Sequence, residues 1–345
     1  MTDNSECSII RINDDSQENE TKIKIIEKEV LKMSVQQAEI LQQKVKNGFM
    51  VECVDDMNEE YLKALKQTLV IVGDTELLSV PPLLTVYDQA PNLNYKITAL
   101  AVMQDEIGHA HIAYRLLEDL GEDVNELLYN RSPNRWKNPY AFDFKLDNWI
   151  ELGVFNGLFD RAGYTLLGDA FEHTSYGPWK RALVKVDKEE LFHLRNGEII
   201  MRAGMKHPET AKQVQEAVDW MFLMALEFFG VADNLKSRSA QLDYKLKGRT
   251  NDELRQKWLS TAVPFCESIG VKVPAHYDET QEKYVLEVPF PCKFDVENKR
   301  WLFDQSDTWD GAIERFKQRG PQNEEFVERI QKGARELAQM RQEEA

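Results

Sequence analysis

Two glutamate–histidine pairs carry the strongest chemical signal in this sequence. The stretch VDKEELFHLRNG, residues 186–197, holds Glu190 and His193, and MQDEIGHAH holds Glu106 and His109 at the same spacing. Positions three apart are neighbours on a helix, so each pair presents a carboxylate and an imidazole on one face. A single pair of this kind is typical of a surface salt bridge, because short motifs often match by chance. The repetition of the pair indicates a shared site instead.

Two lone acids repeat a second spacing. Glu76 in VGDTELLSV lies thirty residues before Glu106, and Asp160 in NGLFDRAGY lies thirty residues before Glu190. The midpoints fall in the turn-like sequences DQAPN and HTSYGP. If the chain reverses there, both members of each couple stand about 15 residues from the turn, roughly 22 Å along antiparallel helices. Each helical hairpin then sets one lone carboxylate level with one Glu-x-x-His pair.

The convergence of these side chains predicts a dinuclear metal site. Their helix faces are otherwise apolar or small, and a buried unpaired carboxylate costs several kcal/mol, so such groups need cations or metals. One carboxylate from each of two helices, with Glu-x-x-His from each of two others, is the ligand set of carboxylate-bridged di-iron or di-manganese sites. Carboxylate-rich ligation with one imidazole per metal favours iron or manganese over structural zinc. The expected ligands, whose four carboxylates are also the expected catalytic groups, are Glu76, Glu106, His109, Asp160, Glu190 and His193.

Another acid precedes each Glu-x-x-His glutamate. These acids, Asp105 and Glu189, are candidates to accept a hydrogen bond from the far nitrogen of a ligating histidine. The alternative for both is a solvated helix edge.

Long helical segments must position these residues. The four that carry the site are expected over 58–80, 93–120, 147–173 and 178–204. Further helices are expected over 208–229, 250–269 and 322–343. The prediction is an all-α fold, a four-helix bundle with additional C-terminal helices, in which Pro81 and Pro82 kink the first bundle helix.

Composition divides the chain into three parts. Residues 1–50 are a polar extension, partly disordered, with an amphipathic helix over 22–46. Residues 51–270 form the catalytic bundle, and 271–345 form a C-terminal arm and helix. Within this arm, 284–303 alternates and contains two prolines, which favours a short hairpin or an extended segment.

Charge and cysteine usage exclude several functions. Acidic residues outnumber basic ones by 59 to 43, a net charge of −16, which makes nucleic acid an improbable partner. The four cysteines are scattered, so neither a disulfide framework nor an iron–sulfur cluster is expected. With no signal-peptide pattern and no long apolar run, we expect a soluble cytoplasmic protein without membrane association. Because dinucleotide and phosphate-loop motifs are also missing, any electrons must come from another protein.

A family resemblance extends beyond the metal motifs. The runs DDMNEEYLKAL, APNLNYKITALAVMQDEIGHAH, SYGPWKRALVKVDKEELFHLRNG and TNDELRQKWLSTAVPFCESIGVKVP resemble the catalytic subunit of phenylacetyl-CoA 1,2-epoxidases. The match covers roughly residues 55–275 and includes stretches far from the expected ligands. That family has a ferritin-like four-helix core, and its iron ligands fall on the same six positions.

The resemblance implies an activity and partners. Two ferrous ions would activate O2, one oxygen atom would enter the aromatic ring of phenylacetyl-CoA, and the other would leave as water. NADPH electrons would arrive through a separate flavin and iron–sulfur reductase. Small accessory subunits and a ferritin-like sister subunit would complete the assembly.

Substrate recognition is less explicit in the sequence. Coenzyme A phosphates need basic residues, and the nearest cluster in the matching segments comprises Lys180, Arg181, Lys185 and Lys188, with Lys245, Lys247 and Arg249 behind it. The alternative for these side chains is an ordinary solvated surface. The family pattern has a lysine four residues before the second-helix glutamate, whereas this chain has Val102. A paralogue that acts on another acyl-CoA thioester therefore stays open.

Other dimetal proteins fit less well. A radical-generating ribonucleotide reductase subunit wants a tyrosine one turn past a histidine ligand, where this chain has Ala113. Iron-storage bundles are about half this length and leave the C-terminal helices unexplained. An inactive scaffold subunit should have lost ligands, whereas all six are present here.

Overall fold

The computed structural model describes residues 36–343. The expected disorder over 1–20 and the first part of the amphipathic helix lie outside the described residues. The rest of that helix is present over 36–46 and buries Leu41 and Val45 against the bundle.

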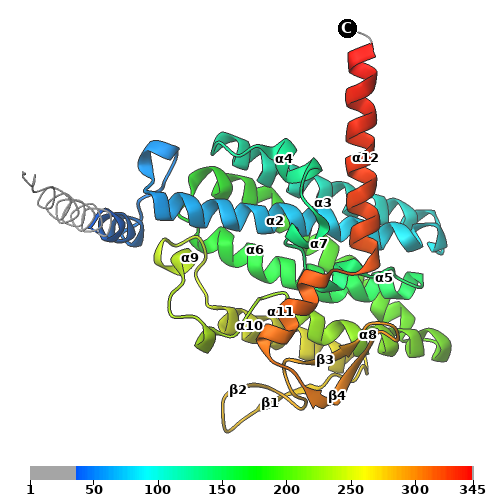
Figure 1. The fold of residues 1–345 in the computed structure, drawn as a ribbon. Coiled ribbons are helices and arrows are strands. Elements are labelled where there is room, and N and C mark those ends of the chain that lie inside the picture. Colours follow the sequence, from blue (N-terminus) through cyan, green and yellow to red (C-terminus); the bar gives the residue numbers. More distant parts are fainter. Residues whose placement is uncertain (1–35, 344–345) are drawn as a thin grey trace, which may run out of the picture.

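Four long helical units form the bundle, as predicted (Figure 1). They are α2 (Glu59–Val86), α3 (Leu93–Asp119), the composite of α5 (Trp149–Phe155), η5 (Asn156–Asp160) and α6 (Arg161–His173), and α7 (Gly177–Gly204). The side-chain oxygens of Asn58, Asn92 and Asn148 accept backbone N–H groups and so cap three of the starts. The chain reverses between α2 and α3 and between α6 and α7, where the midpoint argument predicted.

Further helices pack around this core or extend from it. They are α4 (Val124–Tyr129), α8 (Pro208–Glu227), α9 (Ala240–Asp243), α10 (Asn251–Ser268), α11 (Trp309–Gln318) and α12 (Pro321–Glu343), with 3₁₀ turns at Val54–Asp56, Tyr87–Gln89, Pro133–Arg135, Tyr140–Asp143 and Asp233–Leu235. The far half of α12 stands away from the body in Figure 1. The fold is therefore all-α and ferritin-like, with additional helices after the bundle.

The C-terminal arm contains two antiparallel hairpins where one was expected over 284–303. The strands β1 (Ala275–Asp278) and β2 (Lys283–Leu286) pair with each other, as do β3 (Cys292–Asp295) and β4 (Arg300–Ser306). The first hairpin was missed because its leading strand lies before the alternating run. The indole of Trp301 donates to the backbone oxygen of Trp220, which fixes the second hairpin to α8.

The first bundle helix continues through its two prolines. We expected it to end near residue 80, but α2 runs through Pro81 and Pro82 to Val86. Side-chain hydroxyls donate to backbone carbonyls in this region. Ser79 Oγ donates to the backbone oxygen of Glu76 at 2.7 Å, and Thr85 Oγ1 donates to the backbone oxygen of Pro82 at 2.6 Å. With its 3₁₀ extension, this is the one described helix long and apolar enough to cross a membrane, and 67% of its apolar window is buried inside the bundle. Burial of this kind is typical of a core helix.

A π-helical turn that the sequence did not reveal ends at Asp160. It occupies Asn156–Asp160 and interrupts the α5–α6 helix. A π turn inserts one residue per turn and so rotates the side chains that follow it. Asp160, at the end of this turn, is buried near Glu106 and Glu190, whose negative charges add to the effect of burial and raise its pKa. At this turn the backbones of two helices touch, because a Cβ on Gly197 would lie 2.2 Å from the Gly157 nitrogen.

This contact makes a stability prediction. Gly197→Ala should destabilise the protein by about 1–3 kcal/mol, because the new methyl group meets backbone that cannot yield. The measurement is the free energy of unfolding in urea. The matched control is Gly333→Ala in α12, where a Cβ meets nothing within 4 Å, and it should stabilise by about 0.5–1 kcal/mol. Equal effects of the two substitutions would contradict the role assigned to the helix contact.

Candidate metal centre

The predicted ligands lie in one layer between two apolar clusters. Along α2, Val72 belongs to one cluster and Val80 to the other, with Glu76 between them. Along α3, Ala110 and Met103 flank Glu106 in the same way. All six predicted ligands are buried, the most exposed being Asp160 at 7%. The layer is thus polar and water-poor, with hydrocarbon on both sides.

Within this layer the side chains approach one another closely. The Nδ1 atom of His109 lies 3.2 Å from Glu190 Oε1 and 3.5 Å from Glu76 Oε2. The Nδ1 atom of His193 lies 3.0 Å from Glu106 Oε1. Ligand atoms of Glu76, Glu106, His109 and Glu190 all fall within 4.8 Å of one another, a group that could hold a metal ion.

The far nitrogens of both histidines face the two acids that the sequence singled out. His109 Nε2 is 3.0 Å from Glu189 Oε2, and His193 Nε2 is 3.4 Å from Asp105 Oδ2. Each histidine therefore pairs with the acid of the other helix, so α3 and α7 orient each other's imidazoles. Lys185 in turn binds Glu189 at 2.6 Å.

Burial and mutual charge shift the pKa values of the cluster. Burial raises the pKa of Glu76 and of Asp160 well above the usual range, and the negative charge of Glu106 adds to both shifts. Burial alone would lower the pKa of His109, but hydrogen bonds to Glu190 and Glu76 raise it to about 12. Burial would likewise lower the pKa of His193, but the hydrogen bond to Glu106 outweighs this effect and raises the pKa to about 10. In the absence of another cation, the cluster holds protons.

The donor atoms fit a metal pair. Asp160 Oδ2 is buried without a hydrogen-bond partner, and His109 Nδ1, His193 Nδ1 and Glu190 Oε1 have only the histidine–carboxylate contacts given above. Gly163 leaves room beside them, since a Cβ there would lie 2.7 Å from Glu190 Oε2. Unpaired buried acceptors are costly unless a cation binds them. The oxygen and imidazole donors suit iron or manganese.

A cavity reaches this layer from the α2–α6 side. It has a volume of about 180 Å³, and its wall includes Glu76 and Gly163 together with the apolar side chains of Met224 and Phe228. A second cavity of about 420 Å³ shares Phe228, Leu166 and other wall residues with it, so the two adjoin. Its other lining residues include Lys236, Lys247 and Lys317, and Lys137 lines both. We call the two adjoining cavities the passage. Its walls are mainly apolar, lysines line its wider part, and its inner part reaches Glu76.

One charged group in this passage was not anticipated. Glu227, at the end of α8, lines the smaller cavity and forms an ion pair with Arg315 of α11. Burial raises the pKa of Glu227 to about 7, although the pair with Arg315 opposes the shift. Glu227 belongs to no repeated spacing, so no sequence signal marked it.

The predicted phosphate-binding cluster lies apart from the passage. Arg181 pairs with Glu52, and Lys185 pairs with Glu189. Neither these two nor Lys180 and Lys188 line the described cavities. Of the basic residues named behind them, Lys247 does line the passage.

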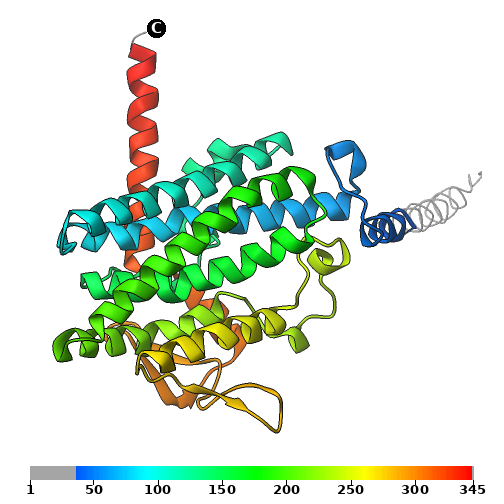
Figure 2. The same cartoon turned by 180° about the vertical axis from the view of Figure 1, so that it is seen from behind.

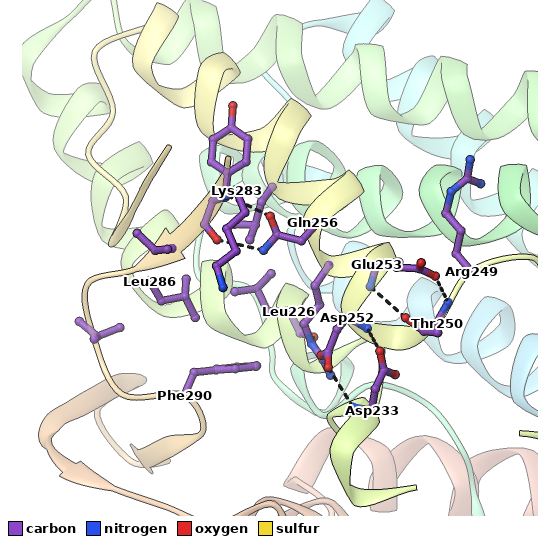
Figure 3. Close-up of a pocket in the computed structure, with 15 residues that line it drawn as sticks. Leu226, Asp233, Arg249, Thr250, Asp252, Glu253, Gln256, Lys283, Leu286 and Phe290 are labelled. Carbon is purple, nitrogen blue, oxygen red and sulfur yellow. Dashed lines mark hydrogen bonds and ion pairs between the residues drawn. The ribbon is translucent and has the colours of Figure 1, made fainter. Parts of the chain in front are cut away.

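The largest described cavity is also remote from the acidic layer. It measures about 830 Å³ and lies between α10 and the segment 283–290 (Figure 3). Its carboxylates are already engaged: Glu253 caps α10 with Thr250, and Asp233 accepts from the N–H groups of Asn251 and Asp252. None of the predicted metal ligands lines it.

Val102, which stands where the family pattern has a lysine, lies in apolar surroundings. Val102 is 1% exposed and belongs to an apolar cluster with Met103 and Ala99. A lysine here would need a partner for its charge inside the core. The surroundings of α3 are therefore adapted to valine.

A buried carboxylate and histidine layer inside an antiparallel four-helix bundle defines the class of ferritin-like carboxylate proteins. Comparison with known families agrees with this class. Residues 33–339 match the family model described as phenylacetic acid catabolic protein, and the chain belongs to that family. A curated relative, the A-subunit of the 1,2-phenylacetyl-CoA epoxidase of Escherichia coli strain K12, is 33% identical over 254 residues, which cover 72% of this chain and 82% of the relative.

The protonated layer makes a prediction about metal binding. Because a metal-bound imidazole must be neutral, binding of Mn²⁺ or Fe²⁺ near pH 7 should release protons, and affinity should rise with pH through the neutral range. Calorimetric titration in two buffers of different ionisation enthalpy measures the release. His193→Ala should lower both affinity and proton release, whereas His111→Ala, on the exposed side of α3, should change neither. Binding without proton release would contradict the cluster as the binding site.

Proposed function

We propose that this protein is the catalytic subunit of a di-iron monooxygenase that inserts one atom of O2 into the aromatic ring of phenylacetyl-CoA as a 1,2-epoxide. The observation that carries the proposal is the apolar passage that runs from cationic walls to Glu76. The name of the E. coli relative supplies the reaction and the substrate. An iron-storage bundle has no need of a passage shaped for an apolar acyl chain with an anionic head.

In this proposal the six buried side chains are the iron ligands. Two ferrous ions, when bound, would supply the site for O2 and pass on the electrons that its cleavage needs. The reaction takes up O2, two electrons and two protons, leaves one oxygen on the ring and releases the other as water. Because the described residues contain no redox-cofactor motif, the electrons are proposed to come from NADPH through a separate reductase.

The chain's own residues hold the substrate and exclude water. The aromatic ring would lie among Met224, Phe228 and Phe316 beside Glu76. The phosphates would meet Lys236 and Lys247 at the wider cavity. Glu227 can hold a proton at neutral pH on the wall of the inner cavity. The hydrogen bonds that the imidazoles donate to Glu189 and Asp105 would keep both rings turned toward the metals.

We also propose the partner proteins and the cellular compartment of this activity. The name of the E. coli relative describes one subunit of an epoxidase, which implies other subunits. We propose small accessory subunits, a ferritin-like sister subunit, and a flavin and iron–sulfur reductase, all in the cytoplasm. A paralogous activity on another acyl-CoA thioester is the second candidate, because Val102 stands where the family pattern has lysine.

Turnover gives the first test. With reductase, partner subunits, NADPH and phenylacetyl-CoA, the protein should form an oxygenated thioester that carries ¹⁸O from ¹⁸O2. Glu190→Ala and Asp160→Ala should lower the iron content and reduce turnover by at least about 100-fold, since each removes a ligand. Full iron content with undiminished activity in both variants would overturn the ligand assignment. Faster turnover of a different acyl-CoA would favour the paralogue.

Substrate affinity gives a second test, through pH. Burial and the neighbouring Lys236 lower the pKa of Lys247 to about 8, and a bound phosphate would raise it again. Thioester binding should therefore take up a proton above pH 8, and affinity should fall as pH rises through that value. In Lys247→Met the affinity should be weaker and this pH dependence should vanish. Lys188→Met is the matched control; a loss of affinity there, with none at Lys247, would return the phosphate site to the α7 cluster.

A further inference from the structure

The end of α8 forms part of the wall of two different cavities. Leu226 lines the cavity of about 830 Å³ beside α10, which Figure 3 shows and which we call the outer cavity. The next residue, Glu227, lines the inner cavity of the passage together with Glu76. The outer cavity belongs to the part of the molecule with α10 and the hairpins, at the bottom of Figure 2. The end of α8 therefore stands between the outer cavity and the cavity that reaches Glu76.

The carboxylate of Glu227 is buried and only half engaged. The residue is 5% exposed, and its Oε1 atom forms the ion pair with Arg315. Its Oε2 atom is buried and has no hydrogen-bond partner among the described residues. Glu227 is also the last residue of α8, where the helix dipole disfavours a negative charge. These surroundings favour a carboxyl group that carries a proton, because a neutral carboxyl costs less to bury than an ionised one.

The cation of this pair has other partners that do not change with pH near neutrality. The Cζ atom of Arg315 lies 5.3 to 5.5 Å from the ring centroids of Tyr140, Trp301 and Phe316. Aromatic faces attract a guanidinium group, and they do so more strongly away from water. Glu227 can therefore take up a proton without leaving the charge of Arg315 unsupported inside the protein.

Unpaired polar atoms connect Glu227 to the outer cavity. Arg255 of α10 lines that cavity, donates to the backbone oxygen of Leu226 at 3.1 Å, and acts on Glu227 through its charge. Its Nη2 atom, like Nε and Nη1 of Arg315, is buried without a hydrogen-bond partner among the described residues. Buried donors and acceptors of this kind bind water in folded proteins, and water carries protons between them. Solvent in the outer cavity can therefore exchange protons with Glu227.

We propose that Glu227 is the proton donor of the reaction and passes protons from the outer cavity to the oxygen atom that leaves as water. The proposal rests on the proposed function, which takes up two protons together with O2 and two electrons. In each transfer an O–H bond of the Glu227 carboxyl breaks, an O–H bond of the departing water forms, and a proton from solvent restores the carboxyl. Two such transfers supply both protons, and the electrons come from the proposed reductase. The wider part of the passage is left to the thioester.

The electrostatics of the site give this donor a pH dependence. Burial raises the pKa of Glu227 to about 7, where a group can both release and regain a proton at neutral pH. The carboxyl is protonated below this value and ionised above it, so turnover should fall as the pH rises through about 7. The charged and titratable groups whose charges act on Glu227, or on which it acts, are Arg315 and Asp307, Arg255 of α10, Tyr140 and Cys292.

The first arm of the test measures turnover of the assembled enzyme at saturating thioester, because Lys247 affects affinity. Glu227→Gln keeps the shape of the side chain but has no acidic proton. It should lower kcat by at least about 100-fold near pH 7, abolish the fall above pH 7, and leave iron content and thioester affinity unchanged. Glu227→Asp should restore part of the rate together with the pH dependence. The control Glu216→Gln, on the exposed side of the same helix, should behave as the wild type does.

The second arm needs no turnover. Infrared spectra of the intact protein, taken as wild type minus Glu227→Gln over a pH series, isolate the C=O stretch of the protonated Glu227 carboxyl. This band should disappear with a midpoint near pH 7. If the ion pair with Arg315 served only to hold α11 against α8, Glu227→Gln would lower the melting temperature and leave the pH profile of kcat as in the wild type.

Two outcomes would overturn the proposal. One is a wild-type kcat and pH profile in Glu227→Gln, and the other is a Glu227 carboxylate that is already ionised at about pH 5 in the infrared spectra. If the wild type oxygenates no thioester, the proposed reaction fails, and stopped-flow oxidation of the chemically reduced, ferrous protein by O2 then tests the donor. That oxidation also consumes protons, so it should be slower in Glu227→Gln, and equal rates would exclude Glu227 as the donor.

Discussion

The cost of burying charge governs this structure. Four carboxylates and two imidazoles lie in one layer of the bundle, with apolar clusters above and below. Protons held between His109 and Glu190 and between His193 and Glu106 offset part of that cost. Asp160 Oδ2 still lacks a hydrogen-bond partner, and both imidazole Nδ1 atoms face carboxylates, so the proposed cation pair would take the place of these protons. Binding of the proposed metals would then stabilise the fold.

The two sides of the buried layer differ in what separates it from the surface. On the α2–α6 side, the inner cavity of the passage reaches Glu76 and Gly163 and is bounded by apolar side chains. On the α3–α7 side, the histidines and their acid partners close the layer toward the surface. The reacting end of the proposed substrate would therefore meet the carboxylates and not the imidazoles.

Repeated spacing made much of this site predictable. Two Glu-x-x-His pairs and two thirty-residue offsets located six buried residues and both chain reversals, because helix geometry converts sequence distance into height along the bundle. Nothing comparable marks the π turn that ends at Asp160, where Gly157 and Gly197 lie in close contact. The passage was also out of reach, since α8 and α11 supply Glu227 and Phe316 from distant parts of the chain. The continuation of α2 through Pro81 and Pro82 was also not predicted, because proline normally ends or kinks a helix.

The central claim is that the buried layer holds a coupled pair of irons. Mössbauer spectroscopy of the ⁵⁷Fe-loaded, oxidised protein tests this most directly. The account predicts two irons per chain in one antiferromagnetically coupled diferric pair, which stays diamagnetic in an applied field at liquid-helium temperature, and loss of that signal in Asp160→Ala. A single magnetically split high-spin ferric species, or a coupled pair that persists unchanged in Asp160→Ala, would contradict it.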